Sequence, residues 1–359
     1  MLESFYRRVR KGTIMDKFVI ASTRKNAGKT SIIIGLTEVL QKKCGYLKPI
    51  GDRLLYRKKR LWDYDSELLT HTLGINEKPE DISIGFEHAK LRYMYDEAGI
   101  REKLREQAAL VAADKDVLFI EAGSGLNFAS SIHLDALSLA RHLEAKLLLV
   151  VGGEEDEILD DITFVKNHLA CDEVQMAGVI INRVKDVDDF KATYMAEIEA
   201  LGVKVLGVLP YKQELTYMPV RYLVDHLFAK VIGGEGGLNK IVQSVFVGAM
   251  SVSAAVQNPL FKKENKMIIT SGDRSDMILV ALETDTSCVV LTNNSLPPAN
   301  IVAKADAANV PMLLVPWDTY RTAQQIDLMD PLLTKDDTPK LELLKKLVGE
   351  SVKTQALFD

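Results

Sequence analysis

Residues 22–31 constrain the fold of this chain more than any other segment. They read S-T-R-K-N-A-G-K-T-S, follow the apolar run 18–21, and precede apolar residues at helical spacing over 31–43. A glycine, a lysine and a hydroxyl residue between a strand and a helix are typical of a phosphate-binding loop, because the N–H groups and dipole of such a helix start attract anions. We therefore predict that nucleotide phosphates bind here.

The polar residues of this loop have distinct expected roles. Lys29 is expected to reach the outer phosphates, and the Thr30 hydroxyl is expected to bind Mg²⁺, a cation that takes oxygen ligands. Thr23 replaces the first glycine of the usual GxxxxGK[ST] pattern, so a degenerate loop that binds nothing is the alternative. The residues predicted to hold the nucleotide are Asn26, Ala27, Gly28, Lys29, Thr30 and Ser31.

Further apolar runs are short, rich in β-branched residues and not alternating, which is typical of strands buried on both faces of a parallel sheet. They cover residues 117–120, 146–151, 178–181 and 203–209, with helical patterns between them. Strands that alternate with helices predict an α/β fold with a doubly wound, mostly parallel sheet.

The pattern weakens after Pro210, and residues 233–237 (G-G-E-G-G) are the most glycine-dense stretch of the chain. We predict a linker there, between a nucleotide-binding domain over 16–232 and a smaller α/β domain over 238–335. The smaller domain has strand-like runs at 267–270, 288–292 and 312–315 and helical patterns at 275–282 and 298–308.

The two ends of the chain have simple expected structures. Residues 336–359 are expected to form a C-terminal helix with Pro339 in its first turn. Residues 1–15 are basic but lack an apolar core, so we interpret them as a leader before Met15. A nucleic-acid arm or a targeting peptide is the alternative.

The overall charge argues against some classes of partner. The 359 residues carry 45 Lys and Arg against 50 Asp and Glu, a net charge of -5, so we expect no nucleic acid and no membrane as partners. No apolar run approaches the roughly 20 residues of a membrane span. Cys44, Cys171 and Cys288 lack a metal-binding spacing, which favours a reducing compartment, and we expect a cytoplasmic protein.

Two acidic residues are candidate Mg²⁺ ligands. Glu121 ends an apolar run, so its carboxylate should emerge at the carboxyl edge of the sheet, where ligands bind in open α/β folds. A surface residue or a helix cap is the alternative. Asp65 lies in W-D-Y-D after the basic run 57–60, where a solvated charged face is the alternative.

These segments together resemble the dethiobiotin synthetase family of P-loop enzymes, and more closely the synthetase-like N-terminal region of long phosphotransacetylases. The matches follow the family order from about residue 16 to residue 211. Besides the loop, they are G-Y-L-K-P-I at 45–50, D-S-E-L at 65–68, F-I-E-A-G at 119–123, G-V-I-I-N at 178–182 and L-G-V-L-P at 206–210.

The resemblance implies three sets of site residues. Mg²⁺ would be held by Thr30, Asp65 and Glu121. The catalytic cations would be Lys29 and Lys48, which would approach the phosphates or an activated carboxylate. Asn182 and Pro210 would frame the adenine of ATP. From the residues alone, Lys48 is a fixed cation near the sheet edge, and Asn182 is a polar strand terminus.

Two departures from the family concern the substrate side. A small Thr/Ser-Gly element of dethiobiotin synthetases is replaced here by Gly51-Asp52-Arg53. The predicted strand 147–151 is followed by the acidic run G-G-E-E-D-E at 152–157, which does not suit a substrate that carries a carboxylate. We therefore do not expect dethiobiotin synthesis.

The region from about 238 to 329 resembles the DRTGG domain that follows the synthetase-like domain in those phosphotransacetylases. The matches are G-D-R-S-D at 272–276, the run ending L-T at 291–292, and 311–316 followed by D-T-Y-R-T-A at 318–323. Asn293 and Asn294 replace the glycine pair. Asp273 and Arg274 either hold a small anionic ligand at a helix start or form a cap and a surface ion pair.

Two functions remain open. In the first, which we favour because the nucleotide elements persist, the chain is a Mg-ATP-binding regulatory or sensory module whose second domain binds a ligand or partner. In the second, it is an ATP-dependent ligase that activates a carboxylate, with Lys29, Lys48 and Mg²⁺ spreading the transition-state charge.

A DNA-partitioning type of ATPase is a weaker third function, suggested by Arg24 near an extra basic position of that superfamily. The 359 residues leave no room for a phosphotransacetylase catalytic domain, so we expect no acetyl transfer from this chain alone. A homo-oligomer is expected by fold analogy.

Overall fold

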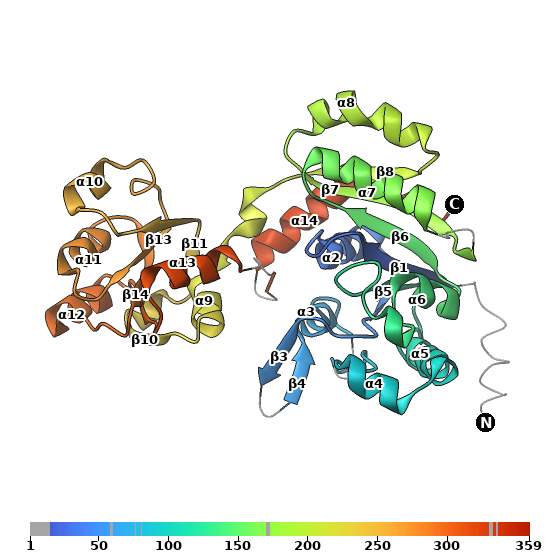
Figure 1. The fold of residues 1–359 in the computed structure, drawn as a ribbon, viewed down its shortest axis with the longest axis horizontal. Helices are drawn as coiled ribbons and strands as arrows, with labels where there is room; N and C mark the ends of the chain where they lie inside the picture. The colour runs from blue at the N-terminus through green and yellow to red at the C-terminus, as the bar shows by residue number, and fades with distance from the viewer. Residues whose placement is uncertain are drawn as a thin grey trace. The chain divides into compact units, whose positions relative to one another are not determined.

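The computed structural model describes residues 15–57, 60–75, 77–79, 81–169, 173–329, 333–334 and 337–359. Residues 1–14 of the predicted leader lie outside these ranges. The chain forms two compact units (Figure 1). Unit 1 contains the chain up to Tyr211 together with the segment from Leu333 to Asp359, and unit 2 contains the segment from Lys212 to Leu332.

Unit 1 is built on a six-stranded sheet in the order β2-β5-β1-β6-β7-β8, in which all five pairings are parallel. The predicted doubly wound α/β fold is confirmed, because each continuous apolar run became a strand with both faces covered. The strands are β1 (Asp16–Ser22), β2 (Cys44–Leu47), β5 (Val117–Glu121), β6 (Lys146–Val151), β7 (Met176–Val184) and β8 (Val205–Pro210).

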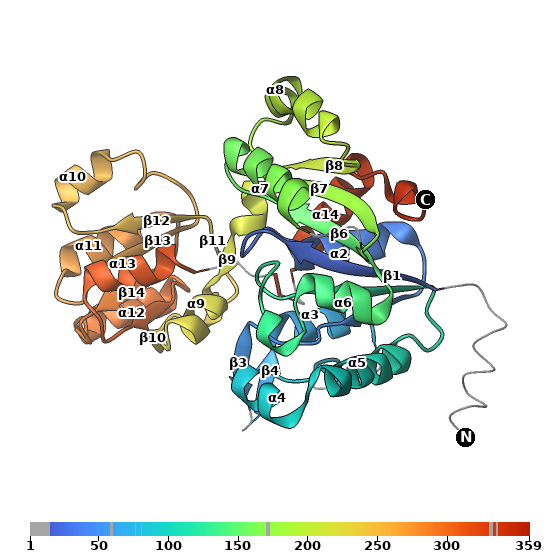
Figure 2. The same ribbon diagram turned by 45° about the vertical axis from the view of Figure 1, so that its right-hand side comes forward.

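Helices cover both faces of this sheet (Figure 2). The strand order reverses at β1, so right-handed crossovers place α2 on one face and the helices that follow on the other. A small antiparallel hairpin, β3 (Leu54–Arg57) with β4 (Arg60–Asp63), precedes α3. The helices are α2 (Lys29–Leu40), α3 (Tyr64–Thr72), α4 (His88–Met94), α5 (Glu97–Val111), α6 (Ala136–Leu143), α7 (Glu155–His168) and α8 (Val187–Ala200), with a 3₁₀ turn at Ser130–Ile132.

The C-terminal segment returns to unit 1. Helix α14 (Thr338–Ser351) has Pro339 in its first turn, and a 3₁₀ turn at Thr354–Leu357 follows it. A Cβ added at Gly35 of α2 would lie 2.3 Å from Val348 Cγ2 of α14, so the two helices are in close contact. The Lys353 N–H also donates a 2.8 Å hydrogen bond to the Leu206 carbonyl of β8.

Unit 2 has a five-stranded sheet in the order β10-β15-β14-β13-β12, parallel except for the antiparallel edge strand β10. A further antiparallel pair joins β9 (Met218–Pro219) and β11 (Ile241–Val242). The sheet strands are β10 (Lys230–Gly233), β12 (Ser244–Val247), β13 (Lys266–Ser271), β14 (Thr286–Thr292) and β15 (Met312–Leu314). The three strands predicted for the smaller domain are confirmed as β13, β14 and β15.

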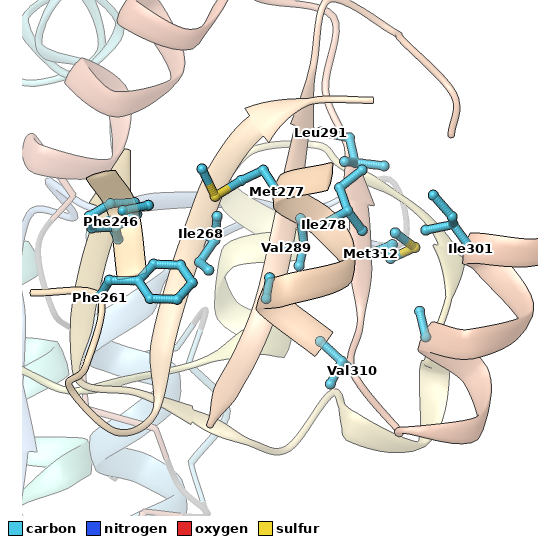
Figure 3. Close-up of a cluster of buried hydrophobic side chains, with 13 residues drawn as sticks. Phe246, Phe261, Ile268, Met277, Ile278, Val289, Leu291, Ile301, Val310 and Met312 are labelled. Carbon is cyan, nitrogen blue, oxygen red and sulfur yellow. The ribbon is translucent and has the colours of Figure 1, made fainter. Parts of the chain in front are cut away.

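Each face of this second sheet buries an apolar cluster. One cluster, drawn in Figure 3, includes Phe246, Phe261 and Met277 and lies under α10 (Val252–Gln257), α11 (Ser275–Leu282) and α12 (Ala299–Ala307). The other lies under α9 (Val220–His226) and α13 (Thr319–Asp327). Short 3₁₀ turns occur at Gln213–Thr216 and Glu235–Gly237.

The structure places the division between the units at Tyr211 and Lys212, not at the glycine-rich residues 233–237. That segment ends β10 and forms a tight turn inside unit 2. Gly234 has φ 71°, and Cβ atoms added at Gly234 and Gly237 would lie 2.1 Å from the Val310 carbonyl oxygen and 2.2 Å from the Asn309 carbonyl oxygen. The glycines permit close backbone approach, so the linker prediction and the domain bounds built on it are corrected.

Within the described ranges, the structure contains no helix with both the length and the apolar character that a bilayer crossing requires.

Candidate nucleotide site

The predicted site residues of unit 1 come from the carboxyl ends of adjacent strands. In the parallel register, Ile20 of β1 is opposite Glu121 of β5, and Leu47 of β2 is opposite Ile120. Lys48, Glu121 and the loop after Ser22 therefore lie at the same edge of the sheet. Ligands bind at this edge in open α/β folds.

The phosphate loop ends in a conformation that favours glycine. Gly28, the residue before α2, has φ 100°, and no side chain caps the helix start. A Cβ at Gly28 would lie 2.3 Å from Asn182 Nδ2, so this position also requires a residue without a side chain. The uncapped N–H groups of the first turn of α2 are suited to bind phosphate oxygens.

Lys29 is the first residue of α2 and is 7% exposed. Its Nζ donates a 3.0 Å hydrogen bond to Ser22 Oγ at the end of β1. Burial lowers the pKa of Lys29, although the nearby Glu121 carboxylate opposes this shift. The ammonium group is thus held under the loop, where phosphate would restore a strong negative partner.

Two of the predicted Mg²⁺ ligands, Thr30 and Glu121, are in direct contact. Thr30 Oγ1 donates to Glu121 Oε1 at 3.1 Å, and Tyr46 Oη donates to Glu121 Oε2 at 2.9 Å. Two adjacent ligands in an octahedral Mg²⁺ shell lie about 3.0 Å apart, so the spacing fits this ion. Burial raises the pKa of Glu121 to about 7.

Lys48 lies within a group of four carboxylates. Its Nζ is 2.5 Å from Asp65 Oδ2, 2.7 Å from Asp52 Oδ1, 3.6 Å from Asp63 Oδ1 and 3.7 Å from Glu121 Oε1. The lysine side chain is only 1% exposed. Burial alone lowers the pKa of Lys48, but the four carboxylates outweigh it and hold this pKa well above its usual value.

Several residues of this network escaped the sequence interpretation. The Asp63 carboxylate caps α3 through the Ser66 N–H at 2.9 Å and accepts the backbone N–H groups of Asp52 and Arg53 at 3.1 Å each. It thereby organises the turn after Pro49. Among the residues that the structure describes, Asp52, Asp63 and Asp65 form a group in which one carboxylate oxygen from each residue lies within 4.8 Å of the others.

The sequence contains no motif or spacing that predicts the roles of these residues. Asp52 and Arg53 stood out only as a departure from the family, and Asp63 only as a neighbour of Asp65. Tyr46 belongs to a buried strand, where its ring gives no hint that its hydroxyl reaches Glu121. Polar contacts between loops leave no periodicity in a sequence.

The two residues expected to frame adenine lie at the ends of the next strands. Asn182, near the end of β7, donates from Nδ2 to the Ala27 carbonyl at 2.9 Å. Pro210 ends β8 and pairs with Val184, and the Tyr211 N–H donates to the Val184 carbonyl at 2.7 Å. The structure thus brings Asn182 directly onto the phosphate loop.

The first half of the loop is tied to α7. Arg24 Nε lies 2.8 Å from Asp161 Oδ2, and its Nη1 lies 2.7 Å from Glu157 Oε1. Thr23 Oγ1, at the position of the missing glycine, donates to Asp161 Oδ2 at 2.6 Å. The basic residue that suggested a DNA-partitioning ATPase is therefore paired within its own unit.

In unit 2 the carboxyl ends of β13 and β14 carry the residues predicted from the DRTGG pattern. Arg274 pairs with Asp276 at 3.0 Å, and its Nη2 donates to the Met250 carbonyl at 3.0 Å. Asn293 and Asn294 have φ 58° and 50°, so they adopt the left-handed conformation that a glycine pair would take. The ion-pair alternative for Arg274 is thus present in the structure.

Comparisons with known proteins also divide the chain into two regions. Residues 16–218 match the AAA domain family and residues 222–329 match the DRTGG domain family. Phosphate acetyltransferases of Pseudomonas aeruginosa and Pseudomonas putida are 27% and 28% identical, each over 93% of this chain and 50% of the relative. The cobyrinate a,c-diamide synthase of Methanocaldococcus jannaschii is 26% identical over 64% of this chain and 51% of the relative.

Two solved structures are each similar to part of the chain. The cell division protein MinD of Aquifex aeolicus is 17% identical over 56% of this chain and 84% of its own, with a TM-score of 0.34. The CBS and DRTGG domains of the regulatory region of Clostridium perfringens pyrophosphatase are 21% identical over 34% of this chain and 50% of their own, with a TM-score of 0.27.

The predicted arrangement, a P-loop domain followed by a DRTGG domain as in the N-terminal region of long phosphotransacetylases, is confirmed. The chain spans about half the length of the phosphate acetyltransferases that it matches. Over residues 16–218 the chain is a member of the AAA domain family, and over residues 222–329 it carries a DRTGG domain.

Proposed function

We propose that this protein binds Mg-ATP in unit 1 and acts as a nucleotide-dependent regulatory or sensory module. The observation that carries the proposal is the state of Lys48. A ligase would aim this lysine at an anionic acceptor, whereas here its ammonium group is buried and faces four carboxylates.

The nucleotide half of the proposal rests on the loop. Gly28 and the uncapped start of α2 suit phosphate, and Lys29 supplies a buried cation. Thr30 and Glu121 would hold Mg²⁺, with Asp65 as a further ligand. When bound, the metal would neutralise charge on the outer phosphates of ATP. In this proposal the other residues of the phosphate loop also hold the nucleotide, and Asn182 and Pro210 frame its adenine.

The surroundings of Lys48 do not suit the anionic acceptor substrate that a ligase would bind. An anionic substrate near Lys48 would meet Asp52 at 2.7 Å and Asp65 at 2.5 Å from the same ammonium group. A further anion at the same ammonium group would be repelled by these two carboxylates, and such repulsion is strong in a buried environment. Asp52 stands where the family resemblance places a small substrate-binding residue, so the position that would accept a substrate carries a negative charge.

An ATP-dependent ligase that activates a carboxylate is the second candidate. It is favoured by the placement of Lys29 and Lys48 in one site, both near Glu121. The relationship to a cobyrinate a,c-diamide synthase over 64% of this chain points in the same direction.

For unit 2 we propose a small anionic ligand or a partner protein at the carboxyl edge of the parallel strands. Asp273–Arg274 follow the end of β13 at Ser271, and Asn293–Asn294 follow the end of β14 at Thr292. Arg274 would exchange Asp276 for the ligand. We further propose that the protein is cytoplasmic and forms a homo-oligomer.

The two candidate functions are separated by ATP turnover. Mg-ATP at about a hundred times Kd should stabilise the folded protein by roughly 2.7 kcal/mol, which calorimetry would measure as a raised melting temperature. In a sensor, phosphate release stays at its basal rate when a pool of small carboxylic acids is added. A large increase in phosphate release with that pool would favour the ligase, and an unchanged melting temperature would contradict both candidates.

A further inference from the structure

Arg53 occupies a position between the phosphate loop and the proposed metal site. Its Nη2 donates a short hydrogen bond to Asn26 Oδ1 of the loop, and its Nη1 lies 3.3 Å from Asp65 Oδ1. The side chain is 23% exposed, so it is reachable from solvent, unlike Lys48, which is 1% exposed. One guanidinium group thus bridges two parts of the candidate site.

The backbone of Arg53 is fixed on the opposite side. Its N–H donates to Asp63 Oδ2 at 3.1 Å, and its carbonyl accepts the Tyr64 N–H at 2.8 Å. The residue therefore sits in a braced turn that leads into the hairpin β3–β4. The guanidinium group at the far end of the side chain takes no part in these backbone contacts.

These contacts with Asn26 and Asp65 place the guanidinium group near the end of a bound triphosphate. In P-loop proteins the metal bridges the β- and γ-phosphates, and the loop encloses the same phosphates from the other side. A cation that touches both the loop at Asn26 and the proposed metal ligand Asp65 must lie beside the last phosphate. Arginine suits this position because its planar fork matches phosphate geometry.

The partners of Asp65 suggest how the contact would form. Asp65 Oδ2 faces Lys48 at 2.5 Å, while Oδ1 faces Arg53. If Arg53 turned from Oδ1 to a phosphate oxygen, that carboxylate oxygen would be free to face the metal. A single exchange of partners would thereby satisfy the arginine and the aspartate together.

We propose that Arg53 contacts the terminal phosphate of the bound nucleotide and makes the site selective for the triphosphate over the diphosphate. The inference rests on the nucleotide binding proposed above. Arg53 belongs to the segment that differs from the dethiobiotin synthetases. In this chain the Asp52-Arg53 segment would bind the terminal phosphate, whereas the corresponding segment of those enzymes binds the substrate.

The test measures the affinities of two ligands, ADP and a non-hydrolysable ATP analogue, by calorimetric titration in the presence of Mg²⁺. A charge-assisted contact is worth about 1.5–3 kcal/mol, or roughly a ten- to hundredfold change in affinity. The Arg53→Gln substitution should raise the Kd of the ATP analogue by about that factor and should change the Kd of ADP by less than about threefold. Arg53→Lys, which keeps the charge but loses the fork, should fall between wild type and Arg53→Gln.

Arg24→Gln is the matched control, since Arg24 also lies beside the loop but is held by Asp161 and Glu157 of α7. It should alter both affinities by the same factor. If Arg53→Gln lost affinity for ADP and for the analogue equally, or lost affinity for neither, the inference would be overturned. Arg53 would then have a structural role or no role in nucleotide binding. Failure of the wild-type protein to bind either ligand would instead refute the proposed nucleotide binding itself. Should Arg53→Gln not fold, as judged by its melting curve, the analogue-to-ADP ratio of Arg53→Lys decides in the same way.

Discussion

Asn182 and Gly28 are in such close contact that the glycine has no room for a side chain: a Cβ at Gly28 would lie 2.3 Å from Asn182 Nδ2. The same amide group donates to the Ala27 carbonyl at 2.9 Å. The end of β7 therefore supports the phosphate loop from below. Asn182 would act on the nucleotide through the loop as well as through any contact with the base.

Gly28→Ala should destabilise the protein and abolish tight nucleotide binding. The positive φ of 100° disfavours alanine, and the clash with Asn182 adds to that strain, for a total of about 1–3 kcal/mol. The double variant Gly28→Ala/Asn182→Ala should recover part of the loss, because the clashing amide is gone. Urea denaturation of the four proteins of this cycle measures the coupling. A coupling free energy near zero would contradict the close contact.

Lys29→Met should abolish tight Mg-ATP binding while leaving a folded protein. The Lys29 side chain is only 7% exposed, so methionine is chosen to keep the aliphatic packing. Loss of one charge-assisted contact corresponds to a ten- to hundredfold weaker Kd, by roughly 1.5–3 kcal/mol. Titration calorimetry compares the variant with wild type. Equal affinities would mean that this loop does not hold phosphate.

Lys48→Met should destabilise the protein strongly, by about 3–5 kcal/mol, because it leaves buried carboxylates without their cation. Lys48→Met/Asp52→Asn should be less destabilised, since one carboxylate is removed with the lysine. Lys345→Met is the control, because that lysine forms an exposed pair with Glu38 at 3.4 Å. Its free energy of unfolding should stay within about 0.5 kcal/mol of wild type. Similar losses for both single variants would refute the structural role of Lys48.

The pH dependence of stability should carry the signature of Glu121. Burial raises the pKa of this carboxyl group from 4.5 to about 7, so the folded state holds the proton more tightly than the unfolded chain. Its contribution to stability is therefore present below the unfolded pKa and is lost as pH rises to the folded pKa. In the absence of nucleotide and Mg²⁺, the free energy of unfolding of wild type should fall relative to Glu121→Gln between about pH 5 and pH 7. A constant difference across that range would contradict the raised pKa.

Removal of the C-terminal segment should unfold unit 1, whereas removal of unit 2 should not. Helix α14 packs on α2, and residues after it bridge to β8 through Gly207 and Val352. A chain that ends before Thr338 would expose these surfaces. A chain in which a flexible linker replaces residues 212–332 keeps them covered. Circular dichroism melts and Mg-ATP binding of the two variants test this. A cooperative melt and intact binding in the first variant would refute it.

The strands were predictable from sequence because they are buried on both faces, so β1, β5, β6, β7 and β8 appear as continuous apolar runs. The site residues that follow such strands were predictable for the same reason: Thr30 and Glu121 meet because β1 and β5 are neighbours. The partner of α14 could not be predicted, since its contact with α2 joins distant segments.

Two other misses have local causes. Glycine density is compatible both with a flexible linker and with close packing, and residues 233–237 belong to the second case. The turn at Asp52–Arg53 is irregular, so nothing in its spacing shows that Asp63 orders it through two backbone N–H groups. Irregular segments encode their structure in particular partners, which only a three-dimensional arrangement reveals.

The carboxylates around Lys48 also limit how this chain can change over evolutionary time. A substitution at position 48 alone leaves uncompensated buried charge, and a substitution at Asp65 alone removes the nearest partner of the lysine. Substitutions at positions 48, 52 and 65 should therefore occur in pairs, or together with a compensating substitution nearby. In an alignment of related chains, an acid at position 52 should accompany a lysine at position 48, and chains that have lost the acid should show a small or polar residue able to admit a substrate.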